Sequence, residues 1–213
     1  MKVANLTGAK TLLEKYLPNV PRGTWDQLLR YIDLTMTWNP SINLTGAKDP
    51  NAFFHEQILD CVAAYQVLPK IQGYMDLGTG AGLPGLVWAI LDPKRRFILV
   101  EILKKRAAFL QRAKGELEIK NVVILQKSFE KLSAEHLPKD FELVSRGTWP
   151  PQSLLRLAAS TPLPWKTWWV FSNENLHRQY LKFSPTYTIR AESLEYPRSE
   201  GEMGLLTRLD RRD

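Results

Sequence analysis

Hydrophobic and polar positions follow a helical spacing in the first third of the chain. Apolar residues three and four positions apart predict one helix around Trp25–Met36 and a second over roughly Pro50–Leu68. Asp49 before Pro50 suits the start of that second helix, as an N-cap followed by a first-turn proline. The intervening segment Trp38–Thr45 is rich in residues that hydrogen-bond to backbone, which predicts a loop.

From Gly73 onward, short apolar runs alternate with helical segments. Strands are expected at Tyr74–Leu77, Phe97–Val100, Val122–Leu125, Phe141–Val144 and Thr167–Phe171, and helices at Gly82–Leu91, Leu103–Leu117 and Gln152–Ala159. An antiparallel pair at Tyr187–Arg190 and Leu205–Leu209 is expected to close the sheet. Such alternation implies a parallel sheet with helices on both faces.

The predicted fold class is therefore α/β, with a mostly parallel seven-stranded sheet of Rossmann-like type preceded by N-terminal helices. We expect residues 1–70 to form a helical region packed on the core. Residues 71–213 are expected to form the sheet-containing domain, as one structural unit.

Composition agrees with an ordinary globular protein of the cytoplasm. The chain has 213 residues, of which 44% are hydrophobic and 24% charged. Cys61 is the single cysteine, so an internal disulfide and a cysteine metal cluster are both excluded. No signal peptide and no membrane-spanning run is recognisable. These features predict a cytoplasmic monomer without a membrane partner.

The segment Asp76-Leu-Gly-Thr-Gly-Ala-Gly-Leu-Pro-Gly85 carries the most specific chemistry. A dinucleotide fold requires a third glycine at position 83, which is Leu83 here. The motif instead begins with Asp76, an anion that suits a ligand carrying an ammonium and a sulfonium. Gly78 and Gly80 allow the tight turn that such a ligand approaches.

Glu101 ends the next apolar run, at the edge of the sheet where ligands of open α/β sheets bind. A carboxylate there can accept hydrogen bonds from ribose hydroxyls. Together these residues resemble the S-adenosyl-L-methionine site of class I methyltransferases. Two other interpretations are a glycine-rich turn without a ligand and a nicotinamide-dependent dehydrogenase, and Leu83 argues against the dehydrogenase.

Further motifs along the chain narrow the resemblance to one family. They are Asn43-Leu-Thr45, Ile58-Leu-Asp60, the glycine motif with its Leu-Pro-Gly ending, Lys105-Arg106 with Phe109-Leu110, and Ser145-Arg146. Their order resembles the bacterial 16S ribosomal RNA guanine-N7 methyltransferase family, once called glucose-inhibited division protein B. The resemblance implies methylation of a guanine in the 530 loop of the small subunit (the 527-type position).

The same resemblance implies which residues contact S-adenosyl-L-methionine. They are Gly78 and Leu83 in the glycine turn, Phe129 and Glu130 after the third strand, and Arg146 after the fourth. Phe129 suits the adenine face, with Glu130 beside it. Arg146 faces either the methionine carboxylate or a substrate phosphate. Without the family pattern, Phe129 reads as a core aromatic and Arg146 as a surface cation.

Positive charge points to RNA as the substrate. The net charge is +7, and two clusters stand out, Lys94–Arg96 and the run of Lys104, Lys105 and Arg106. The second cluster follows Glu101 on the predicted cofactor side, whereas the first is predicted on the far side of the sheet. A solvated helix face explains either cluster almost as well. Trp149, just after Arg146, is the candidate for stacking a guanine.

Guanine N7 has a free lone pair and no proton to lose, so no general base and no catalytic residue is predicted. The chain departs from the family pattern at Ser128 and Ser172, where a basic residue is usual. Two alternatives therefore stay open: a methyltransferase with a different RNA or other substrate, and a non-catalytic RNA-binding assembly factor.

Overall fold

Seven strands form one sheet, in the order β3-β2-β1-β4-β5-β7-β6. The computed structural model describes residues 6, 8–18, 21–198 and 201–212. The strands are β1 (Gly73–Leu77), β2 (Arg96–Val100), β3 (Val122–Leu125), β4 (Phe141–Arg146), β5 (Thr167–Ser172), β6 (Ile189–Pro197) and β7 (Met203–Arg211). The first five are mutually parallel, and β7 pairs antiparallel with both β5 and β6. The predicted α/β class and the antiparallel closing pair are both confirmed.

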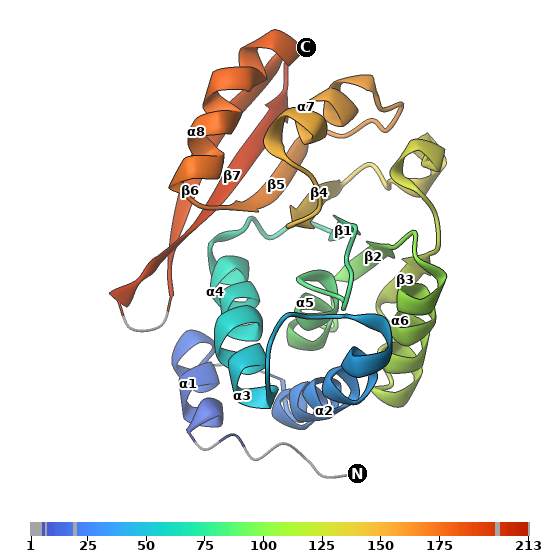
Figure 1. Cartoon of the computed structure of the whole chain (residues 1–213), viewed down its shortest axis with the longest axis vertical. Coiled ribbons are helices and arrows are strands. Elements are labelled where there is room, and N and C mark those ends of the chain that lie inside the picture. The colour runs from blue at the N-terminus through green and yellow to red at the C-terminus, as the bar shows by residue number, and fades with distance from the viewer. Residues whose placement is uncertain (1–5, 7, 19–20, 199–200, 213) are drawn as a thin grey trace.

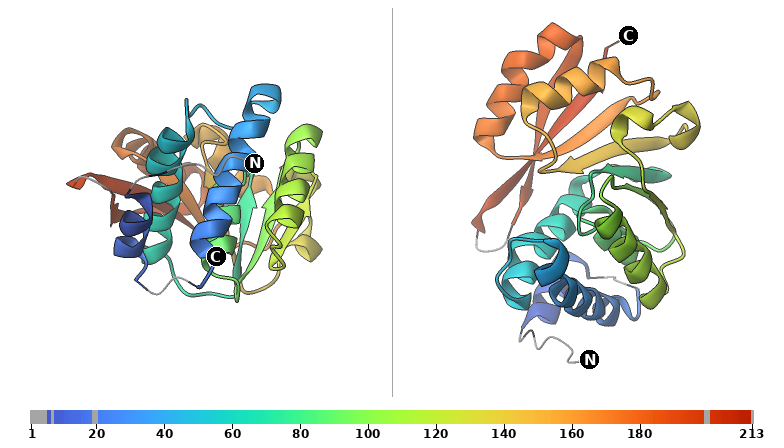
Figure 2. Two further views of the ribbon diagram at one scale, coloured as in Figure 1. Left: turned by 90° about the horizontal axis from the view of Figure 1, so that it is seen from below. Right: turned by 45° about the vertical axis from the view of Figure 1, so that its right-hand side comes forward.

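Helices cover both sides of this sheet (Figure 1). They are α1 (Ala9–Tyr16), α2 (Thr24–Ile42), α3 (Pro50–Ala52), the π-helix η1 (Phe53–Ile58), α4 (Leu59–Val67), α5 (Gly85–Leu91), α6 (Lys104–Glu116), α7 (Pro151–Ser160) and α8 (Glu174–Phe183). Short 3-10 helices are η2 (Phe129–Lys131), η3 (Ala134–His136) and η4 (Ser184–Tyr187). In Figures 1 and 2, α1, α2 and α4 lie on one side of the sheet, and α7 and α8 on the other.

Two apolar clusters form the core, one on each face of the sheet. Alternate residues of a strand point to opposite faces, so Tyr74 joins the cluster of the N-terminal helices while Met75 joins that of α7 and α8. Trp168 and Trp169 divide in the same way, and both are buried. Cys61 is fully buried in the first cluster. Both tryptophans and Cys61 are therefore core side chains.

Helix α2 differs from its prediction because it continues through Pro40 to Ile42, where a loop was expected from Trp38. Pro40 lies in the last turn of the helix; it has no N–H to donate to the Met36 carbonyl, and the helix ends two residues later. Asn43 ends the helix in the left-handed conformation, with φ of 52°, and its N–H donates to the Asn39 carbonyl. The polar residues expected to make a loop therefore make a helix cap.

Helix α8 was not predicted, and β6 and β7 are longer than expected. Helix α5 begins at Gly85 rather than Gly82, because residues before it form the glycine turn.

Candidate functional site

The carboxyl ends of β1, β2, β4 and β5 meet at one edge of the sheet, called here the carboxyl edge. The strand order reverses between β1 and β4, since the chain runs outward from β1 to β2 and β3 and then returns to β4. Ligands of open α/β sheets bind at such a reversal. The glycine turn follows β1 directly and therefore lies at this point.

Asp76 anchors the turn from the last part of β1. Its Oδ2 accepts hydrogen bonds from Thr79 Oγ1 at 2.6 Å and from the Gly85 N–H at 2.8 Å. Its Oδ1 is buried and has no hydrogen-bond partner among the described residues. Burial raises the pKa of Asp76 to about 7, against the opposing effects of Thr79, Gly85 and Arg146. The free carboxylate oxygen fits a positively charged donor such as an ammonium.

Glu101 holds the same turn from the end of β2. This buried carboxylate accepts the Gly80 N–H on Oε2 at 3.0 Å and the Leu103 N–H on Oε1 at 2.8 Å. Each carboxylate oxygen has a second lone pair, so both can accept a further hydrogen bond. Glu101 therefore positions the backbone of the turn, and the ribose contact stays a prediction.

Gly78 and Gly80 in the turn have backbone conformations that disfavour side chains. Gly78 has φ of +70°, and a Cβ on it would lie 2.3 Å from Thr148 Cγ2. Gly80 has φ of +59°, and the nearest atom to its Cβ position is Nη1 of Arg106 at 3.9 Å. A side chain on Gly80 would therefore come into van der Waals contact with Arg106 on α6 and would meet no closer atom. Leu83 is buried behind the turn.

The N-terminal helical region also supports the turn. Tyr31 on α2 donates its hydroxyl to the Ala81 carbonyl at 2.9 Å. Arg106 on α6 donates from Nη2 to the Asn43 carbonyl at 2.7 Å, and its Nε is buried without a hydrogen-bond partner among the described residues. Of the predicted basic run, Arg106 is thus tied to Asn43 at the end of α2. Lys104 and Lys105 are exposed to solvent.

Phe129, expected on an adenine face, is buried against tryptophans. Its ring centroid lies 5.7 Å from that of Trp149 and 5.6 Å from that of Trp168. Glu130 is exposed beside it, and Ser128 precedes it at the start of η2. Trp149 is half-buried, so part of its ring surface remains accessible. The structure brings Phe129 and Trp149 together; their ligand contacts stay predictions.

Arg146 belongs to a charged network that sequence reasoning missed. Asp60 on α4 lies 3.5 Å from Nη2 of Arg146 and 3.0 Å from Nε of Arg198, measured from Oδ2 and Oδ1 respectively. Tyr196 on β6 donates to Oδ1 of Asp60 at 2.7 Å. The guanidinium of Arg146 also stacks on Phe171, 5.7 Å from the ring centroid. Asp60 stood in a noted motif, but no sequence pattern joins it to residues 136 positions later.

This network borders a cavity of about 390 Å³ at the carboxyl ends of β4 and β5. Ser172, Asn173 and Glu195 line it together with Arg146 and Arg198. The hydroxyl of Ser172 accepts a hydrogen bond from Thr207 Oγ1 at 2.9 Å. The cavity contains acidic as well as basic side chains, so it is polar without a strong positive charge.

Each of the three histidines contacts a neighbouring side chain. His136 bonds to Ser133 in a capping box, and His177 lies 2.9 Å from Thr207 Oγ1, while His55 packs edge-on against Phe54. Within the described ranges, no group of three or more His, Cys, Asp or Glu side chains is arranged to hold a metal ion. Across those same ranges, no helix has the length and apolar character needed to cross a membrane.

This sheet order and the acid-anchored glycine turn define a class I S-adenosylmethionine-dependent methyltransferase fold. Among solved structures, a SAM dependent methyltransferase from Aquifex aeolicus superposes with a TM-score of 0.53 at 14% identity, covering 84% of this chain and 97% of that one. At this identity the likeness concerns the fold alone.

The model of one family, described as rRNA small subunit methyltransferase G, matches residues 24–195. This chain belongs to that family. It is 42% identical over 133 residues to ribosomal RNA small subunit methyltransferase G of Wolinella succinogenes, covering 62% of this chain and 67% of the relative. The protein of the same name from Psychromonas ingrahamii is 39% identical over 112 residues, covering 52% and 53%. The chain thus spans from about half to two thirds of the length of the curated relatives it matches.

Proposed function

We propose that this protein transfers the methyl group of S-adenosyl-L-methionine to N7 of a guanine in 16S ribosomal RNA. The observation that carries the proposal is the buried, unpaired Oδ1 of Asp76 at the glycine turn. It lies within the segment that matches the methyltransferase family. A neutral ligand would leave this carboxylate oxygen without charge compensation, whereas an amino-acid ammonium supplies it.

The residues present fit the cofactor. Asp76 would hold its ammonium, and Glu101, which accepts the Gly80 N–H, would meet the ribose. When bound, S-adenosyl-L-methionine supplies an electrophilic methyl group on a sulfonium. Phe129 and Glu130 are proposed at the adenine, with Leu83 behind the turn. The chain itself contributes orientation and the exclusion of water from the turn.

No side chain needs to move a proton from the acceptor, because guanine N7 attacks with its free lone pair. The protein must place N7 in line with the methyl group at near-attack distance. Positioning of this kind can lower a barrier by about 7–11 kcal/mol. Arg146 is suited to that task, because Asp60 fixes its guanidinium at the carboxyl edge beside the glycine turn.

The substrate side of the proposal rests on Lys104, Lys105, Arg106 and Trp149. The two lysines are exposed at the start of α6, next to the turn, where they can contact RNA phosphates. Trp149 keeps an accessible surface near the end of β4, where a guanine turned out of its stack could rest. We further propose a monomer that acts in the cytoplasm on 16S ribosomal RNA or a small-subunit precursor.

Methyl transfer to small-subunit RNA from cells that lack the activity tests the proposal directly. We expect one methylated guanine, mapped by chain cleavage at N7-methylguanine. Transfer to another RNA in place of small-subunit RNA would show that 16S ribosomal RNA is not the substrate. RNA binding without any transfer would favour the assembly factor, and binding of NAD in place of S-adenosyl-L-methionine would favour the dehydrogenase.

A further inference from the structure

A second cavity lies at the opposite edge of the sheet from the glycine turn. It has a volume of about 590 Å³ and is formed where β1, β2, β4 and β5 begin. Five basic side chains line it, against three acidic ones. The basic residues are Lys70, Lys94, Arg95, Lys139 and Lys166. We call this region the amino-edge cavity; it includes part of the Lys94–Arg96 cluster, for which the proposed reaction has no use.

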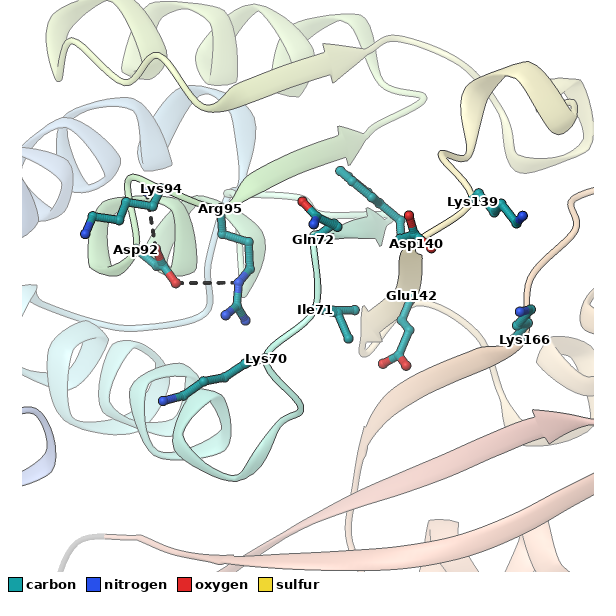
Figure 3. A pocket seen from close by; sticks show the side chains of 11 residues that line it. Lys70, Ile71, Gln72, Asp92, Lys94, Arg95, Lys139, Asp140, Glu142 and Lys166 are labelled. Atoms are coloured by element: carbon teal, nitrogen blue, oxygen red, sulfur yellow. Dashed lines mark hydrogen bonds and ion pairs between the residues drawn. The ribbon is translucent and has the colours of Figure 1, made fainter.

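Figure 3 shows how the charges are distributed around the amino-edge cavity. Lys70, Lys94 and Arg95 lie on one side, and Lys139 and Lys166 on the other. All four lysines are exposed, and their ammonium groups make no ion pair or hydrogen bond with other described residues. Free lysine ammoniums on both sides of a hollow provide a surface for phosphate groups, which lysine binds as a point charge.

Two of the three acidic residues of the amino-edge cavity are engaged, and the third, Asp140, is exposed. Asp92 accepts the Tyr65 hydroxyl at 2.9 Å and pairs with Arg95 at 3.5 Å. Glu142 accepts the Trp169 indole N–H at 2.6 Å, and burial raises the pKa of its carboxyl group. The unpaired lysine charges are therefore only partly offset from within the cavity.

We propose that the amino-edge cavity binds backbone phosphates of a second segment of the substrate RNA. This inference rests on the proposed function, since it concerns the same RNA. The target guanine would lie at the carboxyl edge, so RNA bound at the amino edge would come from another segment of the same molecule. Lysine contacts with phosphates do not depend on the base sequence. The amino-edge cavity would therefore add affinity and orient the RNA without determining which nucleotide is methylated.

The variant Lys139→Ala/Lys166→Ala tests this inference, with Lys10→Ala/Lys15→Ala on α1 as the matched control. Both pairs remove two exposed lysines and the same charge. For full-length small-subunit RNA, the slope of log affinity against log salt should become shallower by about 1.4–1.8 in the cavity variant. The control should keep the slope of the unmodified protein, and calorimetric binding of S-adenosyl-L-methionine should be unchanged in both.

Methylation supplies a second readout. KM for full-length RNA should rise in the cavity variant with kcat unchanged, whereas a short hairpin containing only the target loop should react as well as with the unmodified protein. Equal slopes in all three proteins, or an equal change in the control, would overturn the inference. So would binding of tripolyphosphate in the cavity with RNA affinity unaffected. Failure of the proposed function would instead be seen as no methyl transfer by the unmodified protein.

Discussion

Asp76 couples cofactor binding to pH at the scale of a single residue. Its pKa is raised by burial from 3.8 to about 7, and an ammonium ligand would bind only the ionised form. Affinity for S-adenosyl-L-methionine should therefore rise about tenfold per pH unit between pH 5 and 7 and then level off. Calorimetry at pH 6.5 in two buffers of different ionisation enthalpy should detect release of about one proton.

Asp76→Asn is the control, because it keeps the shape of the side chain and cannot ionise. Its weaker cofactor binding should not change over the same pH range. The stability of the unliganded protein depends on pH in the opposite direction to cofactor affinity, because the folded state holds the Asp76 proton more tightly than the unfolded chain does. This group's contribution to stability therefore falls as pH rises from about 4 to about 7. A flat affinity profile in the unmodified protein would contradict the ammonium contact.

The glycine turn gives a second prediction. Gly80→Val should abolish cofactor binding with the fold intact, because its side chain would stand where the cofactor is proposed to approach the turn, on a residue with positive φ. Glu101→Ala should weaken binding by about 1.5–3 kcal/mol, the value of a lost charged hydrogen bond.

Gly23→Val is the matched control for Gly80→Val. Gly23 also has positive φ, +88°, and open space around its Cβ, but it lies at the start of α2. It should show the strain of a branched residue in this conformation without any loss of cofactor binding. Calorimetry that finds normal binding in both Gly80→Val and Glu101→Ala would place the site elsewhere.

At this scale the sequence predicted the turn more fully than its surroundings. Asp76 accepts hydrogen bonds from Thr79 and Gly85, and Glu101 accepts the Gly80 N–H, so both acids of the motif hold the same turn. Their contacts with the cofactor stay predictions. Phe129 is a different case, since the resemblance implied a contact with adenine, whereas its residue type alone indicated a core aromatic. The structure buries it beside Trp149. The direction in which a loop side chain points depends on its tertiary neighbours, which the sequence alone did not provide.

Helix α5 and strand β1 approach closely at Gly85, and this contact gives a prediction at the scale of elements. A Cβ at Gly85 would lie 2.3 Å from Leu99 Cδ2 and 2.9 Å from Asp76 Oδ2. Gly85→Ala should therefore lower the melting temperature and, by displacing the Asp76 carboxylate, weaken cofactor binding. Overpacking of this kind typically costs about 1–3 kcal/mol.

Gly115→Ala on α6 is the matched control, since no atom lies within 4 Å of its Cβ position. An alanine there should stabilise the protein by about 0.4–1 kcal/mol. Thermal unfolding and calorimetry of both variants measure the contrast. Equal stability of the two would show that helix α5 can move away from β1 without cost.

Elements were predictable where hydrophobic periodicity was strong. The five parallel strands appear at the expected places, because each is a short apolar run bounded by polar residues. Helix α8 was missed because its sequence is mostly polar and only Tyr180 is buried. Strand β6 was predicted to be shorter than it is. It is an edge strand, and most of its residues are at least partly exposed, so its sequence lacks a clear alternation of apolar and polar positions.

For the whole molecule, RNA binding should depend steeply on salt. Lys105→Ala should weaken binding of small-subunit RNA and make the salt slope shallower by about 0.9 at most, with cofactor affinity unchanged. Ser172→Lys should strengthen RNA binding if the family's substrate is retained, because residue 172 lines the cavity beside Arg146.

Filter-binding titrations at several salt concentrations test both variants together. Lys10→Ala, a substitution on the exposed face of α1, controls for the loss of one charge. A slope near zero in the unmodified protein would remove RNA from the proposal and leave a methyltransferase of unknown target.

The ion pair of Asp60 with Arg198 also has a consequence for synthesis on the ribosome. Asp60, the glycine turn and Arg146 emerge early, whereas Tyr196 and Arg198 come from the hairpin of β6 and β7. Strand β7 pairs with β5 and carries β6 at the edge of the sheet. Until that hairpin emerges, Asp60 lacks two of its donors. A nascent chain should therefore complete the charged network around Asp60 only late in translation.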